Sequence, residues 1–120
     1  MNNTPKRVLI FDDNPEILTL CALILKKMKY EVMTRLRCEN VVEDVIGFNP
    51  DIILMDLWIP EIGGQKAVEL LKANPLISHI PVFLFSANPD IREISLRVNA
   101  NGYISKPFNL QVFKDTIESV

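Results

Sequence analysis

The sequence predicts an α/β protein with a doubly wound, five-stranded parallel sheet in the order 2-1-3-4-5 and five helices on both faces. Five short apolar runs alternate with five longer amphipathic stretches over 120 residues, which is typical of a parallel sheet covered by helices. The central runs, such as Ile52–Met55, are apolar throughout, as in strands buried on both faces. The order 2-1-3-4-5 is a common solution for such sheets. We therefore expect a single domain over residues 1–120.

The first half of the chain is expected to form strand, helix, strand and helix. A helix begins after Asn14, because Asn14 can cap it, Pro15 suits its first position and Glu16 places an acid in its first turn. Apolar residues at helical spacing predict the buried faces. The expected strands are Arg7–Phe11 and Glu31–Arg35; the buried face of the first helix is Ile17, Cys21, Ile24 and Met28, and that of a second helix, Val41–Phe48, is Val41, Val45 and Phe48.

The second half repeats the alternation three more times. Asn49, Pro50 and Asp51 end the second helix, and Pro60, Gly63 and Gly64 mark a turn after the third strand. The expected elements are the strand Ile52–Met55, a helix Gln65–Asn74, the strand Val82–Phe85, a helix Ile91–Val98 with Ile91, Ile94 and Val98 inward, the strand Tyr103–Ser105, and a last helix capped by Asn109 with Leu110, Phe113, Ile117 and Val120 on one face.

The composition narrows the possible functions. The chain is 48% hydrophobic and 23% charged with a net charge of −2, and its Lys and Arg residues form no run, so we expect neither direct nucleic-acid binding nor membrane binding. Cys21, Cys38 and the single histidine, His79, show neither a disulfide framework nor the spacing of a zinc site. No signal-peptide core follows Met1, and no apolar stretch is long enough to span a bilayer. We therefore expect a cytoplasmic protein.

Polar residues follow four of the predicted strands. The first strand ends in Asp12 and Asp13, the third in Asp56, the fourth in Ser86 and the fifth in Lys106. In the order 2-1-3-4-5, strands 1, 3, 4 and 5 are neighbours, and ligands of such sheets bind beyond the carboxyl ends of the strands. We expect these five side chains to meet at one rim of the sheet.

Three neighbouring carboxylates repel one another, and one holds a proton at neutral pH unless a cation joins them. Hard oxygen ligands suit Mg²⁺ or Mn²⁺. A carboxylate beside such an ion can act as a nucleophile and form an acyl phosphate. An ammonium group and a hydroxyl group can bind the phosphoryl oxygens. The rim therefore indicates phosphoryl chemistry.

Four segments in this order resemble those of receiver domains, the response regulator modules of two-component signalling. They carry an acidic pair, a phosphoacceptor, a hydroxyl and a lysine before proline. The matching segments are Val8–Asn14, Asp51–Pro60, Pro81–Ala87 and Gly102–Phe108. The resemblance spans essentially the whole chain. It implies a flavodoxin-like fold and a signalling module, not an enzyme, apart from self-catalysed acceptance and slow loss of the phosphoryl group.

The resemblance also implies a metal site and an acceptor. Asp56 is expected to be the phosphoacceptor. Asp13 and Asp56 are expected to ligate Mg²⁺ or Mn²⁺ through their carboxylates, Asp12 to act through a bound water, and the backbone carbonyl of Trp58 to be a further ligand. The bulky side chain of Trp58, at a position that influences loss of the phosphoryl group in this family, favours slow hydrolysis, and Asn88 occupies a second such position.

Further roles follow from the same resemblance. Lys106 is expected to bridge to Asp56 or to the phosphoryl group, and the Lys106–Pro107 peptide bond to be cis. Ser86 is expected to move toward the phosphoryl oxygens as a switch residue, and Tyr103 to swing inward behind it. A sensor histidine kinase or a histidine phosphotransfer protein is the implied donor, docking near the first helix and the site rim. A downstream output domain or target protein is the implied receiver of the signal.

Three other functions fit the sequence less well. Phosphatases of the haloacid dehalogenase type need a second acid two residues after the nucleophile, where this chain has Trp58. Flavodoxin-like electron carriers need a loop that binds phosphate, which Asp12 and Asp13 would repel. A degenerate receiver would lack key residues, and all are present here. Whether the domain is a stand-alone carrier or the regulatory part of a longer regulator or hybrid kinase stays open.

Overall fold

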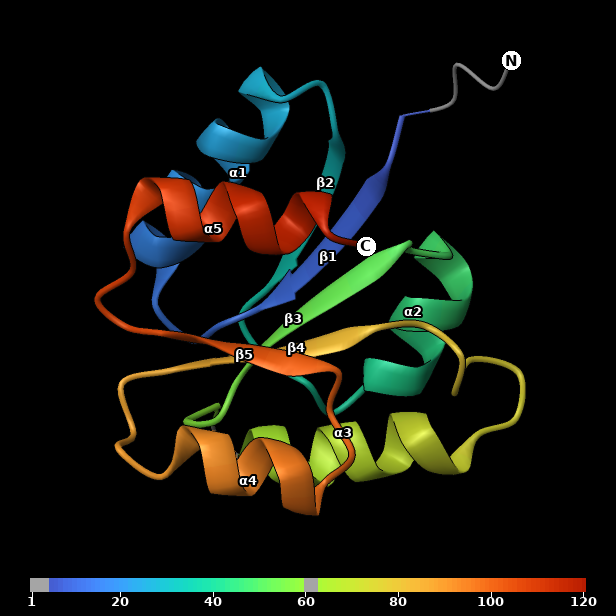
Figure 1. Ribbon diagram of the computed structural model, residues 1–120. Coiled ribbons are helices and arrows are strands. Elements are labelled where there is room, and N and C mark those ends of the chain that lie inside the picture. The colour runs from blue at the N-terminus through green and yellow to red at the C-terminus, as the bar shows by residue number, and fades with distance from the viewer. Residues whose placement is uncertain (1–4, 60–62) are drawn as a thin grey trace.

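The computed structural model describes residues 5–59 and 63–120. Within these residues the strands form one parallel sheet in the order β2-β1-β3-β4-β5 (Figure 1), which confirms the predicted class and order. The elements are β1 (Arg7–Phe11), α1 (Pro15–Lys27), β2 (Glu31–Arg35), α2 (Val41–Phe48), β3 (Ile52–Asp56), α3 (Gly63–Ala73), β4 (Val82–Ser86), α4 (Ile91–Arg97), β5 (Gly102–Ser105) and α5 (Leu110–Glu118).

The helices cover both faces of the sheet. Figure 1 shows α1 and α5 on one face and α2, α3 and α4 on the other. Alternate residues of each central strand enter opposite layers: Val8 and Ile10 of β1 pack under α1 and α5, whereas Leu9 and Phe11 pack toward α2 and α3. The sheet thus separates two apolar cores, and β1 and β3 contribute to both.

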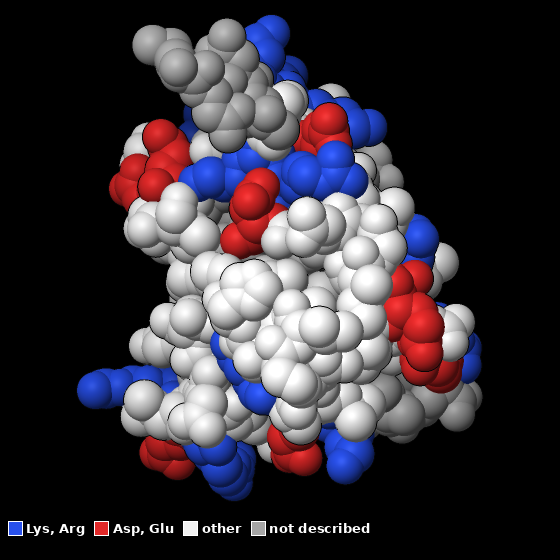
Figure 2. Space-filling view, turned by 90° about the vertical axis from the view of Figure 1, so that its right-hand side faces the viewer, with Lys and Arg blue, Asp and Glu red and all other residues white. Residues whose placement is uncertain are grey.

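The two ends of the sheet differ in character. Figure 2 views the side of the molecule where the strands begin, and its centre is largely uncharged, with Lys, Arg, Asp and Glu around the border. The strands end on the opposite side, where Asp12 and Asp56 are almost fully buried. Buried charge is therefore placed at the carboxyl ends of the strands, where the sequence predicts the site.

Most element bounds agree with the sequence prediction within two residues. The strands β1 and β2 and the helix α2 have the predicted bounds, and β3 and β4 each continue by one residue, to Asp56 and Ser86. The predicted caps are confirmed, because Asn14 Oδ1 accepts the backbone N–H of Glu16 at 2.9 Å and Asn109 Oδ1 that of Gln111 at 2.7 Å. Pro60, predicted in the turn before α3, lies outside the described residues.

The predicted buried face of α1 is wrong by about one position. Leu18, Cys21 and Leu25 are the buried residues of this helix, and three of the predicted residues, Ile17, Ile24 and Met28, are only partly buried beside them. At 3.6 residues per turn both sets lie within one apolar sector, and the sheet meets the centre of that sector.

The predicted face of α5 is also only partly correct. Phe113 and Ile117 are buried in the core beneath the sheet, whereas Leu110, the first residue of the helix, and Val120, beyond its last residue, are exposed. The other predicted faces are confirmed: Val41, Val45 and Phe48 of α2 and Ile91, Ile94 and Val98 at α4 are all buried.

Within the described residues, no helix combines the length and the apolar character needed to cross a membrane.

Candidate functional site

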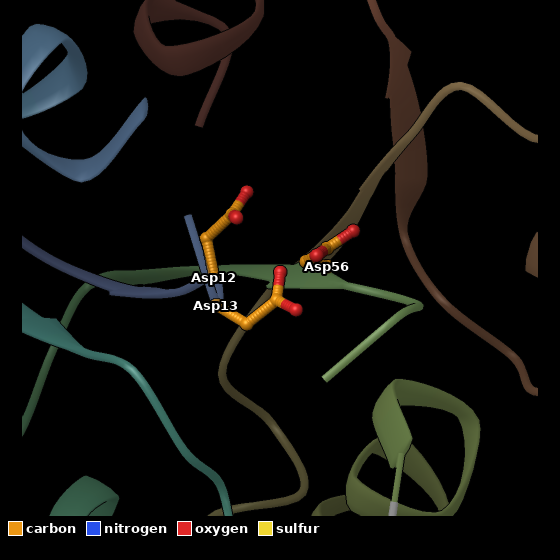
Figure 3. A group of neighbouring side chains, drawn as sticks. All are labelled: Asp12, Asp13 and Asp56. Atoms are coloured by element: carbon orange, nitrogen blue, oxygen red, sulfur yellow. The ribbon is translucent and has the colours of Figure 1, made fainter. Parts of the chain in front are cut away.

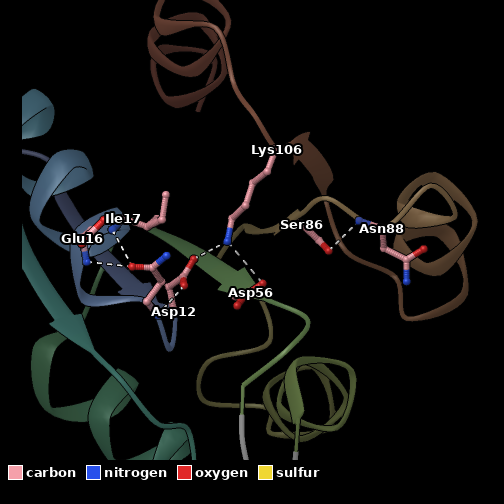
Figure 4. Close-up of polar contacts among 8 residues, drawn as sticks. Asp12, Glu16, Ile17, Asp56, Ser86, Asn88 and Lys106 are labelled. Atoms are coloured by element: carbon pink, nitrogen blue, oxygen red, sulfur yellow. Dashed lines mark hydrogen bonds and ion pairs between the residues drawn. The ribbon is translucent and has the colours of Figure 1, made fainter.

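The polar groups that follow four strands meet at one rim of the sheet. Asp12 follows β1, Asp56 is the last residue of β3, Ser86 is the last of β4, and Lys106 follows β5. Figure 4 shows Lys106 reaching down between Asp12 and Asp56, with Ser86 on the next strand. The parallel register makes this possible, because β1, β3, β4 and β5 are consecutive neighbours and end on the same side.

Three carboxylates form the centre of the site. Oxygen atoms of Asp12, Asp13 and Asp56 all lie within 4.8 Å of one another, and Figure 3 shows the three groups at the ends of neighbouring strands, gathered around one space. Asp12 is fully buried and Asp56 is 3% exposed, while Asp13 is open to solvent. The backbone N–H of Asn14 donates to Asp12 Oδ1 at 2.9 Å, which holds that carboxylate at the start of α1.

Lys106 supplies positive charge to this acidic group. Its Nζ donates to Asp12 Oδ2 at 2.7 Å and lies 3.6 Å from Asp56 Oδ1. The ammonium group also lies over the ring of Phe85, 4.7 Å from its centroid. The sequence predicts a bridge from Lys106 to Asp56 or to the phosphoryl group; the structure shows an ion pair with Asp56 and a shorter contact with Asp12. The Lys106–Pro107 peptide bond is cis, as predicted.

The surroundings of Asp56 favour its protonated form. Burial, and next the charge of Asp12, raise the pKa of Asp56 from 3.8 to about 6, while Lys106 and the backbone N–H of Trp58 act in the opposite direction. One lysine therefore does not fully compensate the three carboxylates. A further cation at this position would relieve the remaining repulsion, so the group has the chemistry of a cation site.

Ser86 is held by the start of the following loop. It is fully buried, and its Oγ accepts the backbone N–H of Asn88 at 3.1 Å. The Oδ1 atom of Asn88 in turn accepts the backbone N–H of Asp90 at 2.8 Å. Since Oγ is an acceptor in its bond, the hydroxyl hydrogen of Ser86 stays available as a donor.

Two predicted residues have side chains that are largely exposed to solvent. Trp58 is 66% exposed and Tyr103 is 39% exposed. A role of Trp58 through its backbone carbonyl does not depend on where its indole lies, and it stays a prediction. The predicted inward movement of Tyr103 also stays a prediction.

Gly64 is a structural part of the site that sequence reasoning treats only as a turn residue. A Cβ atom at this position would lie 2.1 Å from the carbonyl oxygen of Asp56 and 2.8 Å from Cα of Leu57. The backbone N–H of Gly64 donates to the carbonyl of Leu57 at 3.2 Å. The first turn of α3 therefore packs directly on the backbone that carries Asp56. A glycine pair after a strand ending in aspartate is the only signal of this contact in the sequence.

A family model described as the response regulator receiver domain matches residues 8–118. The polar-differentiation response regulator DivK of Brucella anthropi is 30% identical over 118 residues, which are 96% of this chain and 95% of that protein. Hybrid signal transduction histidine kinase D of Dictyostelium discoideum is 31% identical over 105 residues, 85% of this chain, but the match spans only 7% of that protein.

A solved structure with the same fold contains a metal ion. The receiver domain of sensor histidine kinase PA1611 from Pseudomonas aeruginosa has a TM-score of 0.87 and 25% sequence identity, and the match covers 97% of each chain. That structure holds a magnesium ion coordinated in its active site cleft. The fold described above is thus like that of a domain whose active site cleft holds magnesium.

Proposed function

The chain belongs to the response regulator receiver domain family, and on this premise we propose that it accepts a phosphoryl group on Asp56 in a magnesium-dependent reaction. The family is a signalling module of two-component systems, not a classical enzyme. One observation carries the assignment of Asp56. Asp56 stands at the end of a central strand, with a carboxylate oxygen within 4.8 Å of oxygens of two further carboxylates and its Oδ1 3.6 Å from Lys106 Nζ.

The carboxylate oxygens at the rim suit a divalent metal ion as ligands. Asp12, Asp13 and Asp56 offer carboxylate oxygens close enough to share one ion, and such ligands suit Mg²⁺, or Mn²⁺ in its place. Asp13 and Asp56 would bind directly, Asp12 through water, and the carbonyl of Trp58 would complete the protein ligands. A bound ion supplies charge neutralisation and stabilises the negative charge of the transferring group.

The remaining groups are placed to act on the phosphoryl group. An Asp56 oxygen forms a bond to phosphorus while the bond from phosphorus to a histidine nitrogen of the donor breaks, and the electron pair of that bond stays on the imidazole. Lys106 lies near enough to leave Asp12 for a phosphoryl oxygen, and the Ser86 hydroxyl can donate to another. The same groups would assist slow, self-catalysed loss of the phosphoryl group to water.

Movement of Ser86 provides the conformational response. To donate to the phosphoryl group, Ser86 gives up or rearranges its bond from Asn88 at the start of the loop before α4. Tyr103 lies on the neighbouring strand, where Leu84 and Tyr103 are paired in register. Inward rotation of Tyr103 would follow the movement of Ser86 and change the surface formed by α4, β5 and α5. A shift of a few kcal/mol in this balance is enough for a switch.

Receiver domains act with histidine kinases or phosphotransfer proteins, and the outer face of α1 supports docking of such a donor beside the site. Pro15, Glu16, Thr19, Leu20 and Leu23 line a shallow depression there, and Leu20 and Leu23 are 45% and 55% exposed. The helix begins three residues after Asp12. An apolar helix of the donor lying on this face would bring its phosphohistidine to the rim. A downstream output domain or target would respond to the α4, β5 and α5 surface.

The test is to incubate the protein with Mg²⁺ and acetyl phosphate and to measure its intact mass. We expect a gain of one phosphoryl group that a chelator prevents and Asp56→Asn abolishes. Asp90→Asn, at an exposed aspartate before α4, is the matched control and should behave as the wild type. A folded wild-type protein with no adduct would contradict the proposal, and so would rapid release of phosphate from which no adduct accumulates. The lifetime of the adduct tests the expected slow hydrolysis.

A further inference from the structure

The outer edge of β2 is an open sheet edge. β2 pairs with β1 on one side and stands last in the strand order, and no other strand of residues 5–59 and 63–120 covers its second side. Its residues are exposed or half-buried, whereas four of five in β1 and all five in β3 are buried. An open edge presents backbone donors and acceptors that can pair with another strand.

The hydrogen bonds between β1 and β2 determine which backbone groups face outward. The N–H of Glu31 donates to the carbonyl of Lys6 at 2.9 Å, and the carbonyl of Arg35 accepts the N–H of Asp12 at 3.1 Å. Glu31 and Arg35 therefore direct their backbone groups to β1. Because the direction alternates along a strand, Val32 and Thr34 direct their N–H and C=O groups away from the sheet. The carbonyl of Thr34 accepts Nη1 of Arg35 of its own chain at 3.0 Å, and its second lone pair can accept from another strand.

We propose that two copies of this chain associate through antiparallel pairing of their β2 strands, about a two-fold axis at Met33. In this register, Val32 of one copy lies opposite Thr34 of the other. These are the residues with outward backbone groups, so each such pair exchanges two hydrogen bonds. The two-fold symmetry produces the pair twice, as in a closed isologous dimer. The two sheets become one continuous sheet.

The charges of β2 are complementary to themselves in this register. Glu31 of one copy lies opposite Arg35 of the other at a position without backbone hydrogen bonds, where opposing side chains are closest. Both side chains lie on the α2 side of the sheet: Arg35 Nε is 3.4 Å from Asp44 of α2, and Glu31 pairs with Arg7, whose guanidinium lies 4.3 Å from the ring centroid of Phe48. A parallel, in-register pairing would instead place like charges together.

Both charges remain accessible in the single chain. The side chain of Glu31 is 48% exposed and that of Arg35 is 41% exposed, so each can reach a second copy. On the α1 side of the sheet, Leu36 is 48% exposed and follows β2 directly. In the same register it lies opposite Tyr30 of the second copy, which adds an apolar contact to each end of the pairing.

The decisive experiment mixes two charge variants, Glu31→Arg and Arg35→Glu, and measures molar mass by sedimentation equilibrium. Each variant alone replaces both attractive contacts by repulsive ones, and we expect its dimer to be weaker than the wild-type dimer by on the order of tenfold. An equimolar mixture restores two opposite-charge contacts, so the heterodimer should form about as well as the wild-type dimer. Because the mixture contains only the two variants, its recovery also shows that both are folded.

Two results would overturn the proposal. One is a wild-type chain that stays monomeric up to about 1 mM, a concentration at which even weak association is detected. The other is a dimer that both variants retain, or that their mixture does not restore, since association would then use another surface of this chain. The experiment uses neither metal nor phosphodonor, so its outcome does not depend on the proposed function.

Amide exchange provides a second measurement. In a series of increasing protein concentration, the N–H groups of Val32 and Thr34 should gain protection. Those of Glu31 and Met33, already directed toward β1, should change little. Thr34→Pro removes an outward N–H at an edge position that tolerates proline, and it should abolish the dimer. Equal gains at all four positions would contradict the proposed register.

Discussion

At the scale of single residues, the ionised carboxylate of Asp56 is unfavourable unless a positive charge compensates it. It lies 3% exposed beside the buried Asp12, and its pKa rises from 3.8 to about 6 mainly because of burial. The folded protein therefore binds this proton more tightly than the unfolded chain does. The protonated carboxyl of Asp56 therefore stabilises the folded state relative to the ionised one. This contribution to the free energy of unfolding is fully present below about pH 4 and is lost as the pH rises through about 6.

Asp56→Asn should consequently stabilise the metal-free protein at neutral pH. The amide removes a buried charge, so the free energy of unfolding at about pH 7.5 should rise by up to about 3 kcal/mol. The gain should shrink as the pH falls through about 6 and vanish near pH 4, where the wild-type carboxyl is protonated in both states. Urea unfolding in the presence of a chelator, repeated over this range, measures the difference.

The same series with Mg²⁺ is the control. Bound ion stabilises the folded wild type by mass action, and the variant has lost a ligand, so added Mg²⁺ should reduce or reverse the advantage of Asp56→Asn. An advantage that is independent of pH would mean that packing, not charge, separates the two proteins.

The sequence predicts which residues meet at the site because strand ends in a parallel sheet coincide. It does not predict their pairing. Lys106 lies 2.7 Å from Asp12 and 3.6 Å from Asp56, and this choice depends on side-chain torsions and on the ring of Phe85 beneath the ammonium group. Such sub-ångström differences follow from packing, which no local sequence pattern specifies.

At the scale of elements, the first turn of α3 packs so closely on the end of β3 that the structure has no room for a side chain at Gly64. Gly64→Ala should therefore destabilise the protein by about 1–3 kcal/mol or more, because the added methyl meets the backbone of Asp56 and neither can relax without moving the other. It should also slow formation of the phosphoryl adduct, since the acceptor is displaced. Chemical denaturation and the mass measurement with acetyl phosphate check both effects.

Gly47→Ala is the matched control. Gly47 lies in α2, and nothing among the described residues comes within 4 Å of a Cβ placed there. Alanine should raise the stability by roughly 0.5–1 kcal/mol through helix propensity and leave the adduct unchanged. If both variants were equally mild, the close approach at Gly64 would not constrain the site.

Element positions were predictable where caps and breakers are strong. Asn14, Asn109 and the break at Asn49 and Pro50 define helix ends within a residue or two. The buried face of α1 is not predictable in this way, because this helix carries apolar residues around most of its circumference, including Leu20 and Leu23. Only the position of the sheet selects Leu18 and Leu25 as its centre.

At the scale of the whole molecule, burial in the two apolar cores predicts how fast the two cysteine thiols are alkylated. Cys21 and Cys38 are both fully buried, in opposite cores, and burial is the main reason why their thiol pKa values rise to about 12 and about 11. Both thiols should therefore alkylate orders of magnitude more slowly in the folded protein than in denaturant, because labelling requires opening. Peptide mass spectrometry after timed exposure to iodoacetamide measures each rate.

Equal protection of the two cysteines would show that the cores open together. Faster labelling of Cys38 would show that the α2 and α3 layer opens by itself. Rapid labelling of both in native buffer would contradict the burial of the thiols. The sequence predicts Cys21 as a core residue, but the assignment of the two cysteines to different layers follows only from the strand order.

Cys21 has one more consequence, for spectroscopy. Its thiol lies close enough to the rim that Asp12 raises its pKa and Lys106 lowers it, after the dominant effect of burial. Cys38 responds instead to Glu39 and Arg37, also after burial. The S–H stretching band of Cys21 should therefore shift when the charge at the rim changes, while that of Cys38 serves as an internal reference. The protein carries its own infrared label for the state of Asp12 and Lys106, with no probe attached.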